Sequence, residues 1–344
     1  MALKYIGLRR RVVNLVMLLL MAMPLIWCWG ASDTAARALL PSVQLQDLQH
    51  FRKNRSLKHY LDNIQLLIEP SSPCVDHDIP LLALVSSSPD NFEARDAIRK
   101  TWGKELPTFF VLGLNGYQED DLTTDNYLEA KMNHDVIIYQ FRDHYQNLTL
   151  KTALMLQWSS ARCPAARFLL KTDDDVLVNP WAMRRIVEGS YDSLIGYRKE
   201  HNKLHRVEYS KWYIPRWLLA EDYVPEYLSG TGYLINGDNL RKHIDDMLQA
   251  AHTVPLINLE DVYFTYLVAK LKLHLQLSHD RRLSPYRPWL PSVCLYWGLA
   301  SIHSLSPKDI ISWGEALMEI GTQYESGNRI CEFYERVFSE WLLY

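Results

Sequence analysis

The sequence predicts an α/β domain with a mostly parallel central sheet, and three observations support this fold class. Short apolar runs alternate with segments of helical periodicity from residue 79 onward, without an internal repeat or low-complexity tract. The chain of 344 residues is 48% hydrophobic, enough to bury a sizeable core. Strands and helices that alternate at this spacing are typical of parallel sheets.

The individual elements follow from hydrophobic periodicity and from residues that begin or end helices. Apolar runs predict strands at 79–88, 108–113, 136–141 and 166–175. Helical periodicity predicts helices at 91–103, with its start at Asp90 or Asn91, and at 119–135 and 148–163.

The N-terminus predicts a membrane anchor. Lys4 and Arg9 to Arg11 precede an apolar run over 12–31 that is long enough to cross a bilayer, and no clear cleavage site follows. Basic flanking residues keep the N-terminal side in the cytosol. We therefore expect a cytosolic tail at 1–11, a signal anchor at 12–31, a stem at 32–72 and a lumenal catalytic domain at 73–344.

A lumenal location gives meaning to the cysteines and to two glycosylation sequons. Four cysteines lie beyond the anchor and allow up to two disulfides in any of three pairings: Cys74, Cys163, Cys294 and Cys331. Their wide spacing is not that of a zinc site. Asn54 and Asn147 begin acceptor sequons for N-glycosylation. The formal net charge of -3 provides no basic field for nucleic acid.

Three consecutive aspartates, Asp173 to Asp175 in "KTDDDVLV", end the predicted strand at 166–175. Ligands of such sheets bind beyond the carboxyl ends of strands, and carboxylates are ligands for hard divalent cations. A solvated turn before a helix is the alternative, because Asn179 and Pro180 form a typical helix start.

A series of motifs resembles the β1,3-glycosyltransferase family, which includes β1,3-galactosyltransferases and β1,3-N-acetylglucosaminyltransferases. The motifs occur in the family's order: "RDAIRKTWG", "FVLG", "FRDHYQNLTLKT", "KTDDDVLVN", "KWYI", "PEYLSGTGYLI", "EDVYFTYLVAKL" and "IHSLSP". The resemblance implies a GT-A-type domain, a UDP-sugar donor, a glycan acceptor, manganese, and a single-pass type II protein of the Golgi membrane.

The resemblance also assigns roles to the acidic residues. Asp175 is the expected direct metal ligand, while Asp173 and Asp174 contribute to the metal, the ribose or the donor sugar. His303, in "IHSLSP", would complete the metal shell, although a lone histidine is more often structural. A cation held there would stabilise negative charge on the leaving diphosphate.

Glu260 and Asp261 precede an apolar helical run, where acids would favour the positive helix N-terminus. The resemblance implies instead that Asp261 is the general base for the acceptor hydroxyl, which gives inversion without a covalent enzyme intermediate. Glu260 is expected in the sugar pocket.

Further matches concern the sugar and nucleotide pockets. Arg95 and Arg99 share a helical face, either as a solvated stripe or, as the resemblance implies, as donor-binding residues. "YLSGTGYLI" contributes Gly230 and Gly232 for close approach or for positive φ, and Tyr227 and Tyr233 as pocket walls. Val224 and Thr265 depart from the family's usual Tyr and Gly, which puts donor identity in doubt.

The sequence thus predicts transfer of galactose from UDP-galactose to N-acetylglucosamine or N-acetylgalactosamine on glycoproteins or glycolipids. A donor change to UDP-N-acetylglucosamine is the nearest alternative. A lumenal metal-dependent phosphohydrolase would release free sugar or phosphate without acceptor, and a non-catalytic glycan-binding protein would consume no UDP-sugar.

Overall fold

The fold is taken from a computed structural model that describes residues 56–332 except 72, 75–78, 117, 191–192, 209 and 237–239. The predicted anchor at 12–31 and the sequon at Asn54 lie outside these residues. Within them, no helix combines the length and apolar character needed to cross a bilayer.

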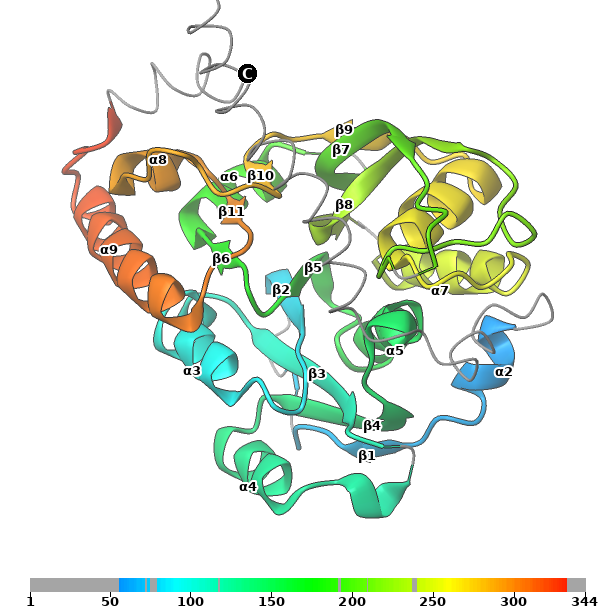
Figure 1. The fold of residues 1–344 in the computed structure, drawn as a ribbon. Helices are drawn as coiled ribbons and strands as arrows, with labels where there is room; N and C mark the ends of the chain where they lie inside the picture. The colour runs from blue at the N-terminus through cyan, green and yellow to red at the C-terminus, as the bar shows by residue number, and fades with distance from the viewer. Residues whose placement is uncertain are drawn as a thin grey trace, which may run out of the picture.

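The described chain forms one large sheet with the spatial order β1-β4-β3-β2-β5-β8-β7-β9 (Figure 1). The neighbours β4, β3, β2 and β5 are parallel, and these are the four predicted strands. However, β8 runs antiparallel to both β5 and β7, and β1 runs antiparallel to β4. The sheet is therefore mixed, with a parallel centre. Its strands are β1 (Leu66–Ile68), β2 (Ile79–Ser86), β3 (Thr108–Leu114), β4 (Val136–Arg142), β5 (Ala166–Asp173), β7 (Leu194–Lys203), β8 (Tyr223–Asn236) and β9 (Leu277–His279).

Helices cover both faces of this sheet, which explains why its central strands read as continuous apolar runs. In β2, Leu82 and Leu84 enter one hydrophobic core, whereas Leu81, Ala83 and Val85 enter the other. The first core includes α5 (Leu148–Arg162), α7 (Leu240–Ala251) and the helix η5 (Val262–Lys272). The second includes α3 (Phe92–Lys100), α6 (Pro180–Glu188), α8 (Val293–Gly298) and α9 (Pro307–Glu325).

Shorter elements complete the described chain. A small second sheet has the order β10-β11-β6. In sequence, β6 follows the three aspartates, whereas β10 precedes α8 and β11 follows it. Its strands are β6 (Leu177–Val178), β10 (Leu283–Ser284) and β11 (Ser301–Ile302). The remaining helices are α2 (Leu57–Leu61), η2 (Trp102–Lys104), η3 (Glu119–Asp121), α4 (Thr124–Asn133) and η4 (Tyr145–Asn147).

The predicted boundary between stem and domain needs correction. Leu57 of α2 is completely buried in the first core, and β1 pairs with β4 at the edge of the sheet. Because both elements lie within 32–72, part of the predicted stem belongs to the folded domain.

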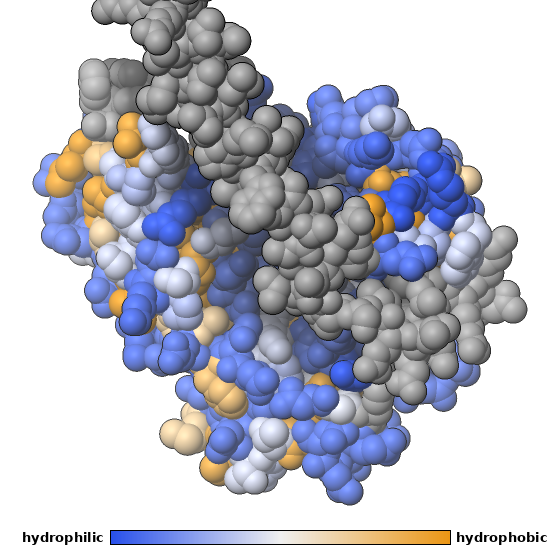
Figure 2. Space-filling model, in the orientation of Figure 1, coloured by the Kyte–Doolittle hydropathy of each residue, from blue (hydrophilic) through white to orange (hydrophobic). Residues whose placement is uncertain are grey.

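On the face shown in Figure 2, hydrophilic residues predominate, and hydrophobic residues include a group on the side formed by α8 and α9.

The four cysteines form two disulfides, and the structure selects one of the three possible pairings. Cys74 is bonded to Cys163 at the end of α5, and Cys294 in α8 is bonded to Cys331. The first bond ties the segment before β2 to the first core. The second ties α8 to the chain beyond α9.

We predict that the first disulfide stabilises the fold more than the second, because it closes a longer loop. The sequence separations are 89 and 37 residues, so the chain-entropy model gives a difference of about 0.8 kcal/mol. Urea unfolding of Cys74→Ala/Cys163→Ala and of Cys294→Ala/Cys331→Ala, each compared with the parent chain, measures this difference. Equal losses would contradict the loop-length argument.

Candidate active site

A cavity of about 630 Å³ opens at the carboxyl ends of β2 and β5. It brings together seven of the predicted site residues from four separate segments, and no predicted metal ligand is missing from its lining. These residues are Asp173, Asp174, Asp175, Gly230, Glu260, Asp261 and His303.

Asp174 is held by the end of β2 and the turn that follows. Its Oδ2 accepts hydrogen bonds from Ser87 Oγ at 2.7 Å and from Asn91 Nδ2 at 2.8 Å. Burial raises the pKa of Asp174 above its ordinary value, although these two hydrogen bonds oppose the shift. Asp174 is thus a fixed part of the cavity wall.

Asp175 lies beside His303 because of the small second sheet. Ile302 of β11 pairs with Leu177 of β6, so the residue after β11 comes close to the residues before β6. The distance from His303 Nε2 to Asp175 Oδ2 is 3.2 Å. Burial alone would lower the pKa of His303, but the hydrogen bond to Asp175 and the negative charges of Asp175 and Asp173 together raise it above its ordinary value.

The buried ammonium group of Lys171 forms hydrogen bonds to three different segments around the cavity. Its side chain is only 3% exposed, and its Nζ donates to Asp173 Oδ1 at 2.9 Å, Gly230 O at 2.7 Å and Glu260 Oε1 at 2.8 Å. Glu260 also accepts a hydrogen bond from the hydroxyl of Tyr233 at 3.2 Å. Burial raises the pKa of Glu260 to about 7 against the attraction of Lys171. Glu260 is therefore bound to protein partners beneath the cavity surface.

The glycine motif forms a bulge inside β8. On the β7 side, Gly196 pairs with Tyr233 and Arg198 pairs with Leu228, so extra residues of β8 bend out toward the cavity. Neither glycine has a positive φ. A Cβ on Gly230 would lie 2.8 Å from Glu260 Oε1, so the close-approach explanation holds for Gly230.

Gly232 and Tyr233 lie away from the cavity. A Cβ on Gly232 would be 3.6 Å from Thr172 Oγ1, an ordinary contact, so this glycine has no steric requirement. Tyr233 is completely buried in the first core and supports Glu260 from below. Their predicted roles as a pocket residue and a pocket wall are corrected accordingly.

Asp261 caps η5, as the helix-start interpretation of the acidic pair predicts, and it also faces the cavity. Its Oδ1 accepts from Val262 N at 2.8 Å and its Oδ2 accepts from Gly230 N at 3.2 Å. Burial raises the pKa of Asp261 above its ordinary value despite these bonds. One hydrogen bond from the start of η5 and one from the β8 bulge thereby fix the orientation of the carboxylate.

The helix behind Asp261 is a π-helix, in which Leu273 N donates to Val268 O five residues earlier. Such helices are rare and often occur at functional sites. Thr265, where the family usually has Gly, is completely buried. Its hydroxyl donates to Asp261 O at 2.6 Å and accepts from Leu228 N at 3.0 Å, so it links η5 to β8 and does not reach the cavity surface.

A second cavity of about 420 Å³ adjoins the first. Asp261, Lys199, Trp212 and Leu259 line both cavities. Tyr227 lines the second cavity, as predicted for a pocket wall, and its hydroxyl accepts a hydrogen bond from Asn202 at 2.8 Å. Val224, the other departure from the family, also lines this second cavity.

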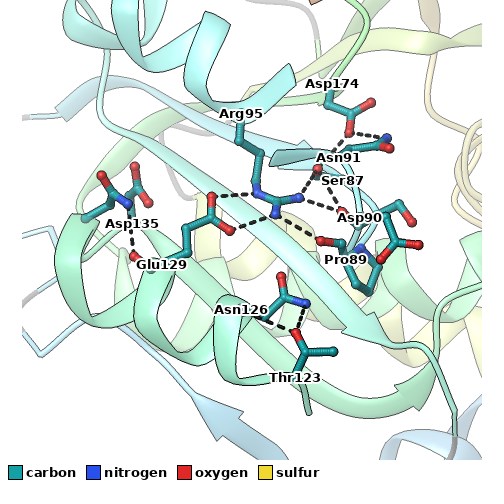
Figure 3. A network of polar contacts seen from close by, with 12 residues as sticks. Ser87, Pro89, Asp90, Asn91, Arg95, Thr123, Asn126, Glu129, Asp135 and Asp174 are labelled. Atoms are coloured by element: carbon teal, nitrogen blue, oxygen red, sulfur yellow. Dashed lines mark hydrogen bonds and ion pairs between the residues drawn. The ribbon is translucent and has the colours of Figure 1, made fainter. Parts of the chain in front are cut away.

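Arg95 and Arg99 do not line either cavity, so their predicted contact with a donor needs correction. Figure 3 shows Arg95 between Glu129 and the turn after β2. Its guanidinium donates to both Glu129 oxygens at 2.8 and 2.7 Å, and to Ser87 Oγ, Ser88 O and Pro89 O. Because Ser87 in turn holds Asp174, Arg95 acts on the cavity through that turn.

Arg99 completes the same buried network. It donates to Glu129 Oε1 at 2.7 Å and to both oxygens of Asp135 at 2.7 and 2.8 Å. Burial alone would raise the pKa of Glu129, but Arg95 and Arg99 outweigh it, so the pKa lies below its ordinary value of 4.5. The motif "RDAIRKTWG" therefore supports the site from behind.

Asn147 does not present a glycosylation site in the folded chain. Its side chain is buried, with 4% of the residue exposed, and its Nδ2 donates to Arg142 O at 2.9 Å. A glycan would have to occupy this nitrogen. The structure thus argues against modification at this predicted position.

Several cavity residues had no role in the sequence predictions. Lys171 belongs to the quoted motif "KTDDDVLVN", and Trp212 belongs to "KWYI", so both had a signal in the sequence. Lys151 likewise belongs to the quoted motif "FRDHYQNLTLKT", whereas Ser87 had no such signal, because only folding brings it to the aspartates. Lys151 is 2% exposed, pairs with Asp143 at 2.6 Å and donates to Ser87 O.

Comparison with known proteins agrees with this geometry. The family model described as Galactosyltransferase matches residues 93–279, more than half of the chain. This chain belongs to the galactosyltransferase family. The match runs from α3 to β9 and includes the aspartates, the β8 bulge and Asp261. The chain is accordingly a glycosyltransferase of the hexosyltransferase type, and the family implies a nucleotide-sugar donor and a glycan acceptor.

Two relatives illustrate the range of donors within the family. Beta-1,3-galactosyltransferase 5 of Mus musculus is 32% identical over 259 residues, which cover 72% of this chain and 82% of the relative. The Homo sapiens acetylgalactosaminyl-O-glycosyl-glycoprotein beta-1,3-N-acetylglucosaminyltransferase is 29% identical over 324 residues, covering 88% and 80%.

We predict that Lys171→Met destabilises the protein by about 3–5 kcal/mol, because it leaves the buried Glu260 without its ion-pair partner. The double variant Lys171→Met/Glu260→Gln removes both charges and should recover most of this loss. Urea unfolding of the single and double variants measures the coupling. Additive losses would show that the two residues do not stabilise each other.

The Arg95, Arg99 and Glu129 network predicts an acid-sensitive contribution to stability. Because the pKa of folded Glu129 is lowered, its contribution is complete above the unfolded value near 4.5 and is lost as pH falls through the folded value. We expect Glu129→Gln to cost about 3–5 kcal/mol at neutral pH. Its unfolding free energy should fall less steeply than that of the parent below pH 4.5. Parallel pH profiles would contradict the assignment.

Proposed function

We propose that this chain is an inverting, divalent-metal-dependent β1,3-galactosyltransferase. It moves galactose from UDP-galactose to a terminal N-acetylglucosamine or N-acetylgalactosamine of a glycoprotein or glycolipid. The observation that carries the proposal is the position of Asp261 in the wall shared by the two cavities. With the donor in the cavity of the three aspartates and the acceptor in the second cavity, the reacting atoms meet at this carboxylate.

The proposed reaction is a single displacement. Asp261 accepts the proton of the acceptor hydroxyl while that oxygen bonds to the anomeric carbon of the donor sugar. The bond from that carbon to the diphosphate oxygen breaks, its electron pair leaves with UDP, and the configuration inverts. The raised pKa of Asp261 makes it a better proton acceptor than an exposed aspartate.

The residues present fit a manganese ion that takes a few ligands from the protein and the rest from the phosphates of the donor. The described residues contain no group of three or more acidic, histidine or cysteine side chains arranged to hold an ion. Asp175 and His303 form a pair, and Asp173 opens to the same cavity. Cations in nucleotide sites are often held by one or two carboxylates plus substrate phosphates. When bound, the ion supplies positive charge to the diphosphate.

The alternative donor is UDP-N-acetylglucosamine, and the human relative with that activity in its name supports this alternative. A Golgi membrane location with a lumenal domain remains part of the proposal and rests on the basic and apolar residues of 1–31. Incubating the chain with manganese, a panel of UDP-sugars and simple glycoside acceptors, followed by linkage analysis of the product, tests donor, acceptor and linkage together. Release of free sugar without acceptor would contradict transfer.

We predict that Asp261→Asn lowers turnover by about 100 to 10,000-fold while affinity for UDP and manganese persists, because only the proton acceptor is lost. Asp175→Asn should instead weaken UDP-manganese binding, because it removes an anionic oxygen ligand. Initial rates and UDP affinity measured with and without manganese separate the two roles.

Asp96→Asn is the matched control, since the Asp96 side chain is half-exposed on α3 and, among the ion pairs of the described residues, pairs only with Lys100. It should leave both measurements unchanged. Normal turnover of Asp261→Asn would eliminate Asp261 as the base. Loss of both turnover and UDP-manganese binding in that variant would place it among the metal ligands.

A further inference from the structure

The second cavity differs from the first in the charge of its lining. Lys199, Lys203 and His205 line it, and Asp261 is its single carboxylate among the described residues. The first cavity contains the three consecutive aspartates together with Asp143, Glu260 and Asp261. The two cavities thus have opposite charge character although they share a wall.

The lysines of the two cavities also differ in their partners. Of the lysines that line the first cavity, Lys151 is paired with Asp143 at 2.6 Å and Lys171 with Glu260 at 2.8 Å, Lys211 lies over the rings of Tyr145 and Trp212, and Lys199 is shared with the second cavity. For Lys199 and Lys203, the described part of the chain offers no carboxylate within 4.0 Å. Their positive charge is therefore available to a ligand in the second cavity.

These two lysines lie along one face of β7. They are four residues apart in the strand, and both line the second cavity. Lys199 pairs in register with Tyr227 of β8, and its Nζ lies 5.9 Å from the centre of that ring. Lys203 pairs with Tyr223 at the outer end of both strands. Positive charge thus extends from Asp261 outward along the cavity.

An aromatic side chain, Trp212, lies beside this charge. Trp212 lines both cavities, and its ring lies 5.0 Å from that of His205. Arg206 fixes the loop that contains Trp212 by donating to Ile214 O at 2.6 Å, to Leu219 O at 2.9 Å and to Glu221 O. An aromatic face next to cationic groups suits a sugar ring that carries an anionic substituent.

We propose that the second cavity takes an acceptor glycan bearing an anionic group, as sulfate, phosphate or carboxylate, on the reacting sugar or on the sugar next to it. The inference rests on the proposed function, because it assigns the acceptor to the second cavity. Lys203 is the specificity-determining residue that can be tested separately, since it lies at the outer end of β7 and Asp261 at the inner end of the cavity.

The test compares matched acceptors with the full-length chain, UDP-galactose and manganese. The panel consists of a neutral N-acetylglucosamine glycoside, its 6-O-sulfate, its 6-O-phosphate, and a disaccharide glycoside that contains glucuronic acid. We expect at least one anionic acceptor to have a KM about tenfold below that of the neutral glycoside, with similar kcat. The preference should shrink at ~1 M salt, where the Debye length is about 3 Å. The arm with the lowest KM identifies the anionic group.

Lys203→Gln should raise the KM of the preferred anionic acceptor toward the neutral value, by a larger factor than it changes the KM of the neutral acceptor. Lys308→Gln is the control, because Lys308 is an exposed lysine of α9 that lines neither cavity. Equal or poorer use of every anionic acceptor would overturn the inference while leaving the proposed function intact. If no acceptor is glycosylated, the proposed function fails. Equilibrium binding of the same glycosides to the full-length chain then shows whether the chain binds the anionic glycosides more tightly than the neutral one.

Discussion

The buried ammonium group of Lys171 is the contact on which the geometry of the site depends. It joins the end of β5, the bulge of β8 and the acidic pair before η5, which are separated by 59 and 89 residues in sequence. Leaving a buried charge unpaired is strongly destabilising, so these segments must meet for the chain to fold stably. The same contact positions Asp173 and Glu260. Through Gly230, which also bonds Asp261, it connects the aspartate cluster with the proposed base.

A second buried cation fixes the opposite wall of the site. Arg95 donates hydrogen bonds to Glu129 and to Ser87 in the turn after β2. Ser87 in turn donates a hydrogen bond to Asp174. Neither Arg95 nor Glu129 lines the cavity. Their effect on the site is therefore one of position, and it depends on an ion-pair network built between α3, α4 and the strand ends.

The two adjoining cavities divide the charges that the proposed reaction requires. In the cavity with the aspartates, Lys151 and Lys171 are paired with neighbouring carboxylates, and the described lining has six carboxylates and four lysines, which leaves negative charge suited to a cation and its diphosphate ligand. The second cavity keeps the positive charge of its lysines. Asp261 lies where the two environments meet, and burial there raises its pKa. In the proposed reaction, the proton of the acceptor hydroxyl therefore moves to Asp261 at the boundary between the positively and the negatively charged cavity.

The sequence by itself determined the parallel centre of the sheet, the helices between its strands and the chemical identity of the acidic residues. Periodicity suffices for these features because β2 to β5 are buried on both faces and read as short continuous apolar runs, which the longer helical segments separate. The motifs also located Asp261 and the aspartates, since each lies at the end of a recognisable element.

Only the tertiary structure decided which side chains reach the cavities. The helical spacing of Arg95 and Arg99 does not reveal that acids from α4 and from the start of β4 surround them. Nor does a glycine-rich stretch reveal that it is a bulge inside a long strand, or that Leu66–Ile68 closes the sheet edge. Burial of Asn147, the disulfide pairing and the proximity of His303 to Asp175 all depend on contacts between residues distant in sequence. Local pattern encodes periodicity and residue chemistry, whereas partners and access to solvent arise only when the elements pack.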